Sequence, residues 1–239
     1  MASTDIAAIL RGKVKFHVRD ISNSDIEIDQ IVLQVIEDIA NETKIFRKIY
    51  GFTVDKSINV YDFNALSFLN NRLEVQSITI GSVTSDSVLS YMQTYDTFPS
   101  PTVSTTTFAN TKNIPLELMD VYDENGYSII NKFHYSGTSE RICNDAKWLE
   151  DNHAIDKAFV MSVVPDIQEL RSEELSVITA CIIEGCKYYF SNTYESTPDG
   201  QITNLYYQRY WQKKQLLINQ FPTKIFAHIR NKEGARKWL

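Results

Sequence analysis

The sequence predicts an α+β fold in which a helix hairpin and an N-terminal helix form a small bundle, with a β-rich insertion and an extended C-terminal tail. Three features indicate this class. Residues 171–221 contain two segments with apolar side chains every three or four positions, which is the spacing of one helix face. A similar segment follows Ser24, and between residues 49 and 165 the apolar spacing falls to two, as in a β-strand.

These patterns divide the 239 residues into four parts. We expect an N-terminal arm at 1–23, because that stretch has no sustained periodicity. The helical domain combines 24–48 with 166–221, the β-rich insertion domain is 49–165, and a docking tail occupies 222–239. A chain of this length can bury a core as one large domain or as two small ones.

The helix predicted at 24–48 has signals at both ends. Ser24 and Glu27 form a capping box, in which each side chain can accept a hydrogen bond from the backbone N–H of the other residue. Basic residues close the segment, where the helix dipole favours positive charge: Lys44, Arg47 and Lys48. Its apolar face continues for about six turns. That face comprises Ile28, Ile31, Val32, Val35, Ile39, Thr43 and Phe46.

The first half of the insertion is expected to begin with a hairpin. Residues 50–54 and 58–63 both alternate, and Asp55-Lys56-Ser57 between them is typical of a turn. Another strand is expected at 73–80. Residues 96–113 are rich in Thr, Ser and Pro, and we interpret them as a long exposed loop that crosses between strands or, alternatively, binds a partner.

The second half of the insertion contains a stronger turn signal. Asp123-Glu124-Asn125-Gly126 separates the predicted strands 115–122 and 127–135, and Asn and Gly tolerate the positive φ that a tight hairpin turn needs. A short helix is expected within 139–151, followed by an apolar strand at 158–164.

The helix hairpin is the segment around which the other predictions are arranged. Its helices are separated by Ser196-Thr197-Pro198-Asp199-Gly200, where proline removes a backbone donor and glycine permits positive φ. The second helix, 201–220, has a stripe that is apolar at both ends and basic between them. We expect the basic residues Arg209, Lys213 and Lys214 to face another subunit or a channel. The many aromatic residues of both helices are attributed to packing between the helices rather than to base stacking.

The sequence lacks the motifs of common enzymes. It has no glycine-rich phosphate loop, no nucleophile elbow and no metalloprotease helix motif, and its four histidines lie far from one another and from the cysteines. We therefore expect no catalytic residue, no cofactor and no metal. Three cysteines without zinc-like spacing fit a reducing compartment, and Cys181 and Cys186 are expected to be core thiols. No apolar run approaches the roughly 20 residues that span a bilayer, so no membrane association is expected.

The tail at 222–239 differs in charge from the rest of the chain. It has five basic residues and one acidic residue, a net charge of +4, so the remainder carries −10 of the total of −6. Its first half alternates polar and apolar residues, as a strand added to another protein's sheet does. The alternative is a frayed chain end; we favour docking on a partner, because large apolar residues at a frayed end have little to bury against. The predicted docking residues are Lys224, Ile225, Phe226, Ile229, Arg230, Lys232, Arg236, Lys237, Trp238 and Leu239.

Two stretches together resemble a known family. The first is the helix from Asp25 to Phe46 with the following Val60-Tyr61-Asp62-Phe63, and the second runs from Val164-Pro165-Asp166 through the small-residue segment 181–185 to Asn204-Leu205-Tyr206-Tyr207-Gln208-Arg209-Tyr210. In order and spacing they resemble the head-to-tail connector proteins of tailed bacteriophages, which include adaptors and the gatekeeper-type tail tube proteins of short-tailed phages.

The resemblance implies a structural virion protein of the phage neck or tail, made in the host cytoplasm. Such a protein forms a ring, with twelve copies expected, which joins the portal protein to a downstream tail or nozzle protein. Its helices surround the channel, and genomic DNA passes through without specific binding. The C-terminal extension of such proteins reaches into the portal ring, which is the role that the resemblance gives to the tail at 222–239. The net charge of −10 on the residues outside this tail suits a channel lumen that repels DNA phosphate.

An alternative function follows from the insertion rather than from the helices. A β-rich region with a Thr-rich loop at 96–113 is also compatible with a tail-associated receptor- or carbohydrate-binding module. That alternative predicts a trimer and surface aromatic residues in the insertion, and it leaves the long helices unexplained.

Overall fold

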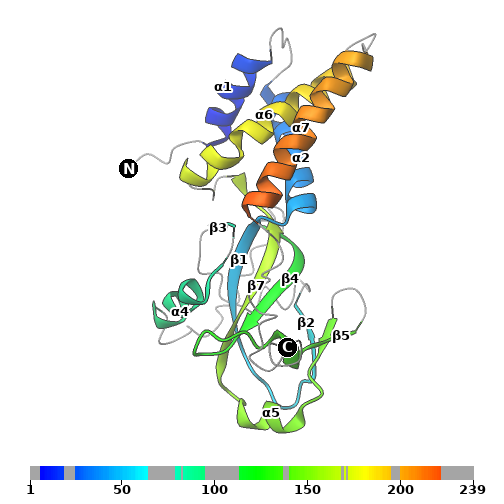
Figure 1. Ribbon diagram of the computed structural model, residues 1–239. Helices are drawn as coiled ribbons and strands as arrows, with labels where there is room; N and C mark the ends of the chain where they lie inside the picture. Colours follow the sequence, from blue (N-terminus) through cyan, green and yellow to red (C-terminus); the bar gives the residue numbers. More distant parts are fainter. Residues whose placement is uncertain are drawn as a thin grey trace, which may run out of the picture.

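The computed structural model describes most of the chain. The described residues are 6–18, 25–63, 79–81, 83–94, 113–136, 140–167, 170, 172–194 and 200–221. Within them the fold is a mixed α+β fold, as predicted, with the four longest helices gathered at one end of the molecule and antiparallel strands with shorter helices at the other (Figure 1).

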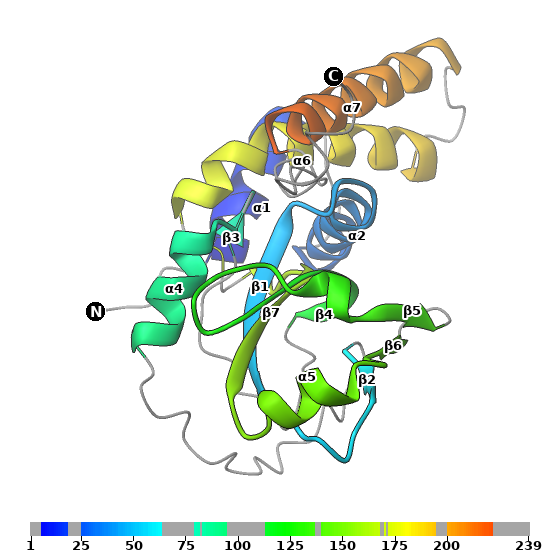
Figure 2. The same cartoon turned by 60° about the horizontal axis from the view of Figure 1, so that its bottom comes forward.

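Four helices form the bundle: α1 (Ile6–His17), α2 (Asp25–Thr43), α6 (Ser172–Tyr194) and α7 (Gly200–Gln220). The last two form the predicted helix hairpin and pack along each other. Its tip, where α6 ends and α7 begins, projects away from the other elements (Figure 2). The hairpin is thus anchored at one end and extends beyond the core at the other.

Two antiparallel sheets form the other end. The four-stranded sheet has the order β3-β1-β7-β4, with β3 (Thr79–Ile80), β1 (Phe46–Thr53), β7 (Asp156–Val164) and β4 (Ile114–Tyr122). The three-stranded sheet has the order β2-β6-β5, with β2 (Val60–Asp62), β6 (Glu140–Ile142) and β5 (His134–Ser136). Shorter helical elements are α4 (Ser85–Thr94), η1 (Ile130–Lys132) and α5 (Ala146–Asp151).

The larger of two apolar clusters runs from the bundle into the sheets, and a smaller one lies between the four-stranded sheet and α4. Between the two sheets the larger cluster consists of aromatic rings whose paired centroids lie 5.0 to 6.4 Å apart, a range in which edge and offset contacts are favourable. These rings belong to Phe52, Tyr61, Phe63, Phe133 and Phe159. The division of the chain into a helical domain and an insertion domain stays a prediction.

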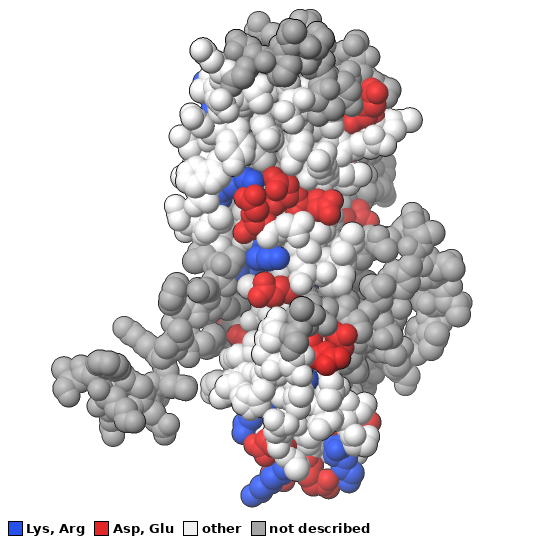
Figure 3. Space-filling view, turned by 90° about the vertical axis from the view of Figure 1, so that its right-hand side faces the viewer, with Lys and Arg blue, Asp and Glu red and all other residues white. Residues whose placement is uncertain are grey.

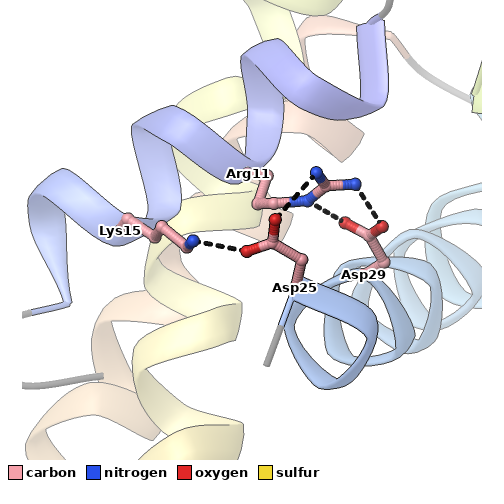
Figure 4. A network of polar contacts seen from close by, with 4 residues as sticks. All are labelled: Arg11, Lys15, Asp25 and Asp29. Carbon is pink, nitrogen blue, oxygen red and sulfur yellow. Dashed lines mark hydrogen bonds and ion pairs between the residues drawn. The ribbon is translucent and has the colours of Figure 1, made fainter. Parts of the chain in front are cut away.

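The expected N-terminal arm is wrong for residues 6–17, which form α1. Leu10 and Val14 lie one turn apart and are fully buried. Arg11 donates two hydrogen bonds to Asp29, one of them 2.8 Å from Nε to Oδ1, and Lys15 pairs with Asp25 (Figure 4). The helix therefore forms because it covers the bundle with one face and pairs its cations with the acidic start of α2.

The predicted helix at 24–48 ends early. It stops at Thr43, and Lys44 has a φ of +51°, the left-handed conformation that commonly terminates a helix. Phe46, Arg47 and Lys48 belong to β1 and are buried there, so the two cations lie beyond the last turn of the helix; the Nε of Arg47 donates to the carbonyl of Lys44 at 3.4 Å. Ser24, and with it the capping box, lies outside the described residues.

Both predicted β-hairpins need correction. Residues 50–54 and 58–63 do not pair with each other, because β1 pairs with β3 and β7 whereas β2 pairs with β6. The turn at 123–126 forms as expected, with Gly126 at a φ of +74° and its N–H 3.0 Å from the carbonyl of Asp123. Beyond it the pairing continues only as far as Ile129: Ser128 bridges to Tyr122, and the Ile129 N–H donates to the Val121 carbonyl at 2.7 Å. The chain then leaves to form η1 and β5, and β5 belongs to the other sheet.

The remaining insertion predictions have mixed outcomes. The strand at 158–164 is confirmed and begins two residues earlier, at Asp156. The expected helix within 139–151 is α5 only from Ala146, because Glu140–Ile142 is strand β6. Most of the strand at 73–80 and all of the loop at 96–113 except Asn113 lie outside the described residues.

Three helices make their closest approach at Gly185 of α6. A Cβ on this residue would lie 2.6 Å from Cγ1 of Val35 in α2 and 2.9 Å from Cε2 of Tyr210 in α7. Both distances are shorter than ordinary carbon contacts, so the bundle needs a residue without a side chain here.

Replacing Gly185 with alanine is expected to destabilise the protein by about 1–3 kcal/mol, because α2 and Tyr210 must move to admit the methyl group. Chemical denaturation measures the change. Gly12→Ala in α1 is the matched control, since a Cβ there meets no atom within 4 Å. We expect that control to stabilise the helix by about 0.5–1 kcal/mol. Equal destabilisation by both substitutions would contradict the close-approach explanation.

Candidate subunit interface

A buried polar network joins α7 to α2. The Tyr210 hydroxyl donates to Oδ2 of Asp38 at 2.6 Å, and the Lys214 ammonium lies 3.0 Å from the same oxygen and 2.7 Å from Oε2 of Glu42. The Lys214 side chain is only 4% exposed, and its ammonium lies 4.4 Å from the centre of the Tyr210 ring. These contacts fix the rotation of α7 about its own axis.

The network changes the ionisation of its members. Burial disfavours the charged form of Lys214, but hydrogen bonds to Glu42 and Asp38 outweigh burial and raise its pKa. Burial and the hydrogen bond to Asp38 raise the pKa of Tyr210. Burial likewise raises the pKa of Cys181 and of Cys186 to about 12, so both are neutral core thiols, as predicted.

The structure separates the three basic residues expected on one face of the second hairpin helix. Lys214 points into the protomer, where its charge is already paired with two carboxylates. Its assignment to a subunit or channel face is therefore corrected. Arg209 and Lys213 are exposed, and neither forms an ion pair with another described residue.

With Lys214 inside, a different set of residues forms the outer side of α7. Five exposed residues follow one another at three- and four-residue steps and so share one side of the helix. We call them the α7 stripe: Ile202, Leu205, Arg209, Lys213 and Leu216. Tyr207 and Trp211 lie on another side and line a shallow open pocket with Gln208 and Gln212. Tyr207 also contacts Tyr188 of α6 at a centroid distance of 5.4 Å, which supports the expected aromatic packing between the helices.

The outer side of α2 was not among the predicted sites. It presents five exposed residues at three- and four-residue steps, the α2 stripe: Ile26, Gln30, Leu33, Glu37 and Asn41. Ile26 and Leu33 are 70% and 52% exposed although the opposite side of the same helix is buried and, apart from Thr43, apolar. Two large apolar residues on the polar side of an amphipathic helix were the available sequence signal. On the face drawn in Figure 3, the largest cluster of acidic side chains lies near the middle of the molecule, with smaller acidic groups above and below it.

The β-rich end has exposed aromatic residues as well. Tyr127 and Tyr135 are 70% and 67% exposed, and the guanidinium of Arg141 lies 3.9 Å from the centre of the Tyr135 ring. A second open pocket, formed largely by the loop after β1, includes Ile58 and the imidazole of His153. The docking residues predicted at 222–239 lie outside the described residues, so their prediction stays open.

Among the described residues, no three His, Cys, Asp or Glu side chains are grouped so that they could hold a metal ion. None of the helices in that part of the chain has the length and apolar character needed to cross a membrane.

The separate roles of neighbouring lysines lead to a prediction. Lys214→Met is expected to lower the free energy of unfolding by about 1–2 kcal/mol, because Asp38 and Glu42 lose a buried partner. Lys213→Met, the exposed control, is expected to change it by less than about 0.5 kcal/mol. Denaturation at low protein concentration measures both.

The stabilisation by Lys214 should depend on pH, because its pKa is raised in the folded protein. The difference in free energy of unfolding between wild type and Lys214→Met should be complete below the ordinary lysine value of 10.5, and it should shrink as pH rises through the higher folded pKa. A loss that is instead greatest at high pH would contradict the ion pairs.

No protein-family model matches this chain, and a search of curated proteins finds no match. The function is therefore inferred from the two exposed stripes, the projecting hairpin and the resemblance described above.

Proposed function

We propose that this chain is a structural protein of the bacteriophage neck. Copies of it form a ring, with twelve expected, which joins the portal protein to a downstream tail or nozzle protein and surrounds the channel through which genomic DNA passes. No catalytic group, cofactor or metal is required for this role. The ring needs rigid helices, adhesive surfaces on each copy and a lumen that does not hold DNA.

One observation carries the proposal: α7 exposes large apolar side chains on a hairpin that projects from the rest of the protomer. The exposed fractions range from 42% for Ile202 to 58% for Leu216, with Leu205, Tyr207 and Trp211 between them. Single exposed apolar residues are ordinary on protein surfaces, but several along one helix indicate a surface that is covered in an assembly. The projecting position makes the helix accessible to neighbouring copies.

Charge supports the same role. Residues outside the tail at 222–239 carry a net −10, and a ring lumen with this sign repels phosphate, so that DNA slides. The tail itself, with a net +4, is suited to an acidic cleft on the portal. Portal docking through this tail, like the virion location, is part of the proposal.

A second candidate is favoured by a different observation. The exposed rings of Tyr127 and Tyr135 lie in the β-rich end, where a tail-associated receptor- or carbohydrate-binding module would present aromatic residues. This candidate expects a trimer and gives no role to the exposed side of α7. The stoichiometry of the assembly therefore separates the two functions.

We expect the full-length chain to form a ring on its candidate portal, and a chain that ends at Phe221 to lose portal binding while it keeps its fold. Native mass spectrometry and negative-stain imaging of each protein, alone and mixed with portal, measure mass and symmetry. Circular dichroism provides the control for folding. A monomer or trimer that is indifferent to portal would reject the neck proposal and favour the receptor-binding candidate. Equal portal binding by both chains would reject only the role of the tail.

A further inference from the structure

We propose that the α7 stripe of one copy docks on the α2 stripe of the next copy, with Arg209 facing Glu37 and Leu205 facing Leu33. This inference rests on the proposed ring and names the two surfaces that join its neighbours. Every residue of both stripes is exposed in the protomer, and each stripe combines large apolar residues with charge of one sign.

The charges of the two helices are complementary. From Gly200 to Gln220, α7 contains three basic residues and no acidic residue, whereas α2 contains six acidic residues and no basic residue from Asp25 to Thr43. One basic residue, Lys214, is already used inside the copy against Asp38 and Glu42. Arg209 and Lys213 remain exposed on the α7 stripe, and Glu37 remains exposed on the α2 stripe. The contact between copies would thus repeat chemistry that already holds the two helices together within a copy.

Self-pairing of either stripe is unfavourable. A two-fold interface between two α7 stripes would place Arg209 and Lys213 near their own counterparts, and an α2 pair would do the same with Glu37. Complementary surfaces at different places on one chain instead produce a head-to-tail interface, and such an interface closes into a ring when its rotation permits. The charge pattern therefore selects the kind of contact that a ring needs.

The direction of the helices fits this contact. α2 and α7 both run from the hairpin end of the bundle toward the sheets (Figure 1). In the proposed ring the symmetry axis runs along the helices, and rotation about such an axis does not change the direction in which a helix runs. α7 of one copy and α2 of the next copy therefore lie parallel. In a parallel alignment, Leu33 stands opposite Leu205, Glu37 opposite Arg209 and Asn41 opposite Lys213. In this register the two stripes overlap from Gln30 to Asn41 and from Ile202 to Lys213, a length of about 17 Å at 1.5 Å per residue.

Charge reversal tests the pairing. Arg209→Glu and Glu37→Arg, each in the full-length chain, are expected to raise the protein concentration at half-assembly by about tenfold or more, because each places like charges in contact. An equimolar mixture of the two variants should recover assembly. In a ring where the two variants alternate, the two reversed charges would meet at one interface, and the unaltered Arg209 and Glu37 would meet at the next.

Gln208→Glu is the matched control, because residue 208 adjoins Arg209 but lies beside the Tyr207 pocket rather than on the α7 stripe. Sedimentation velocity and native mass spectrometry, with portal present if the ring needs it, measure assembly. Thermal unfolding by circular dichroism should be the same for all chains, since the substituted residues are exposed.

The outcomes separate this inference from the proposed function. Rings that are unaffected by either reversal would overturn the α7–α2 contact and leave the neck role standing. Loss of assembly by both variants without recovery in the mixture would also overturn it, because the two charges would then act at separate contacts. A wild-type chain that stays monomeric with and without portal would overturn both the contact and the neck role.

Discussion

The close approach of α2, α6 and α7 at Gly185 is the constraint on which the rest of the bundle depends. Because this residue has no side chain, the Tyr210 ring can lie against α6 and its hydroxyl can reach Asp38. That contact brings Lys214 between Asp38 and Glu42, which sets the rotation of α7. Which side of α7 is exposed therefore depends on the absence of a side chain at Gly185 in α6.

Several cations lie in the interior, and two of them, which pair with carboxylates of other elements, serve as fixed links between elements. Lys214 joins α7 to α2, and Lys157 in β7, whose side chain is fully buried, pairs with Glu124 in the turn after β4. A buried cation that loses its partner carries a large desolvation cost, so each pair resists sliding of the elements that it connects. Rigidity of this kind suits a protein whose proposed task is mechanical rather than chemical.

The sequence predicted the helices better than the strand pairing, for a physical reason. A helix satisfies its own backbone hydrogen bonds, so the periodicity of 172–194 and 200–220 was sufficient to identify the hairpin. Alternation in 50–54 indicates a strand but says nothing of its partner, which is β7 rather than the adjacent segment. The sequence does not predict α1 although Leu10 and Val14 have helical spacing. Among the α1 residues whose burial is described only these two are buried, and the acidic partners of the helix, Asp25 and Asp29, lie in another element.

The candidate interface was predicted in part. Arg209 and Lys213 were chosen for their charge, and both are exposed. Lys214 has the same charge and follows Lys213 directly, but one residue along a helix turns the side chain by about 100°, so the two lysines lie on different sides of α7. Which of the two is buried depends on the position of α2, which the sequence alone does not give. Ile26, Leu33 and Glu37 were overlooked because the apolar core face of α2 gave the stronger signal. Exposure on the polar side becomes informative only when the neighbours of a helix are known.

The pairing of β1 with β7 has a consequence for how the chain folds. Their partners, such as Tyr50 and Phe159, are more than 100 residues apart, so the centre of the larger sheet depends on contacts that are distant in sequence. Chains with such contacts fold slowly, because loop closure is costly before the pairing can compensate for it. At roughly 5–20 residues per second, a ribosome needs about 5–20 s to deliver β7 after β1 has emerged. During that interval β1, whose side chains are mostly buried in the folded protein, cannot pair with β7. In this state the nascent chain is most prone to aggregation or to binding by chaperones.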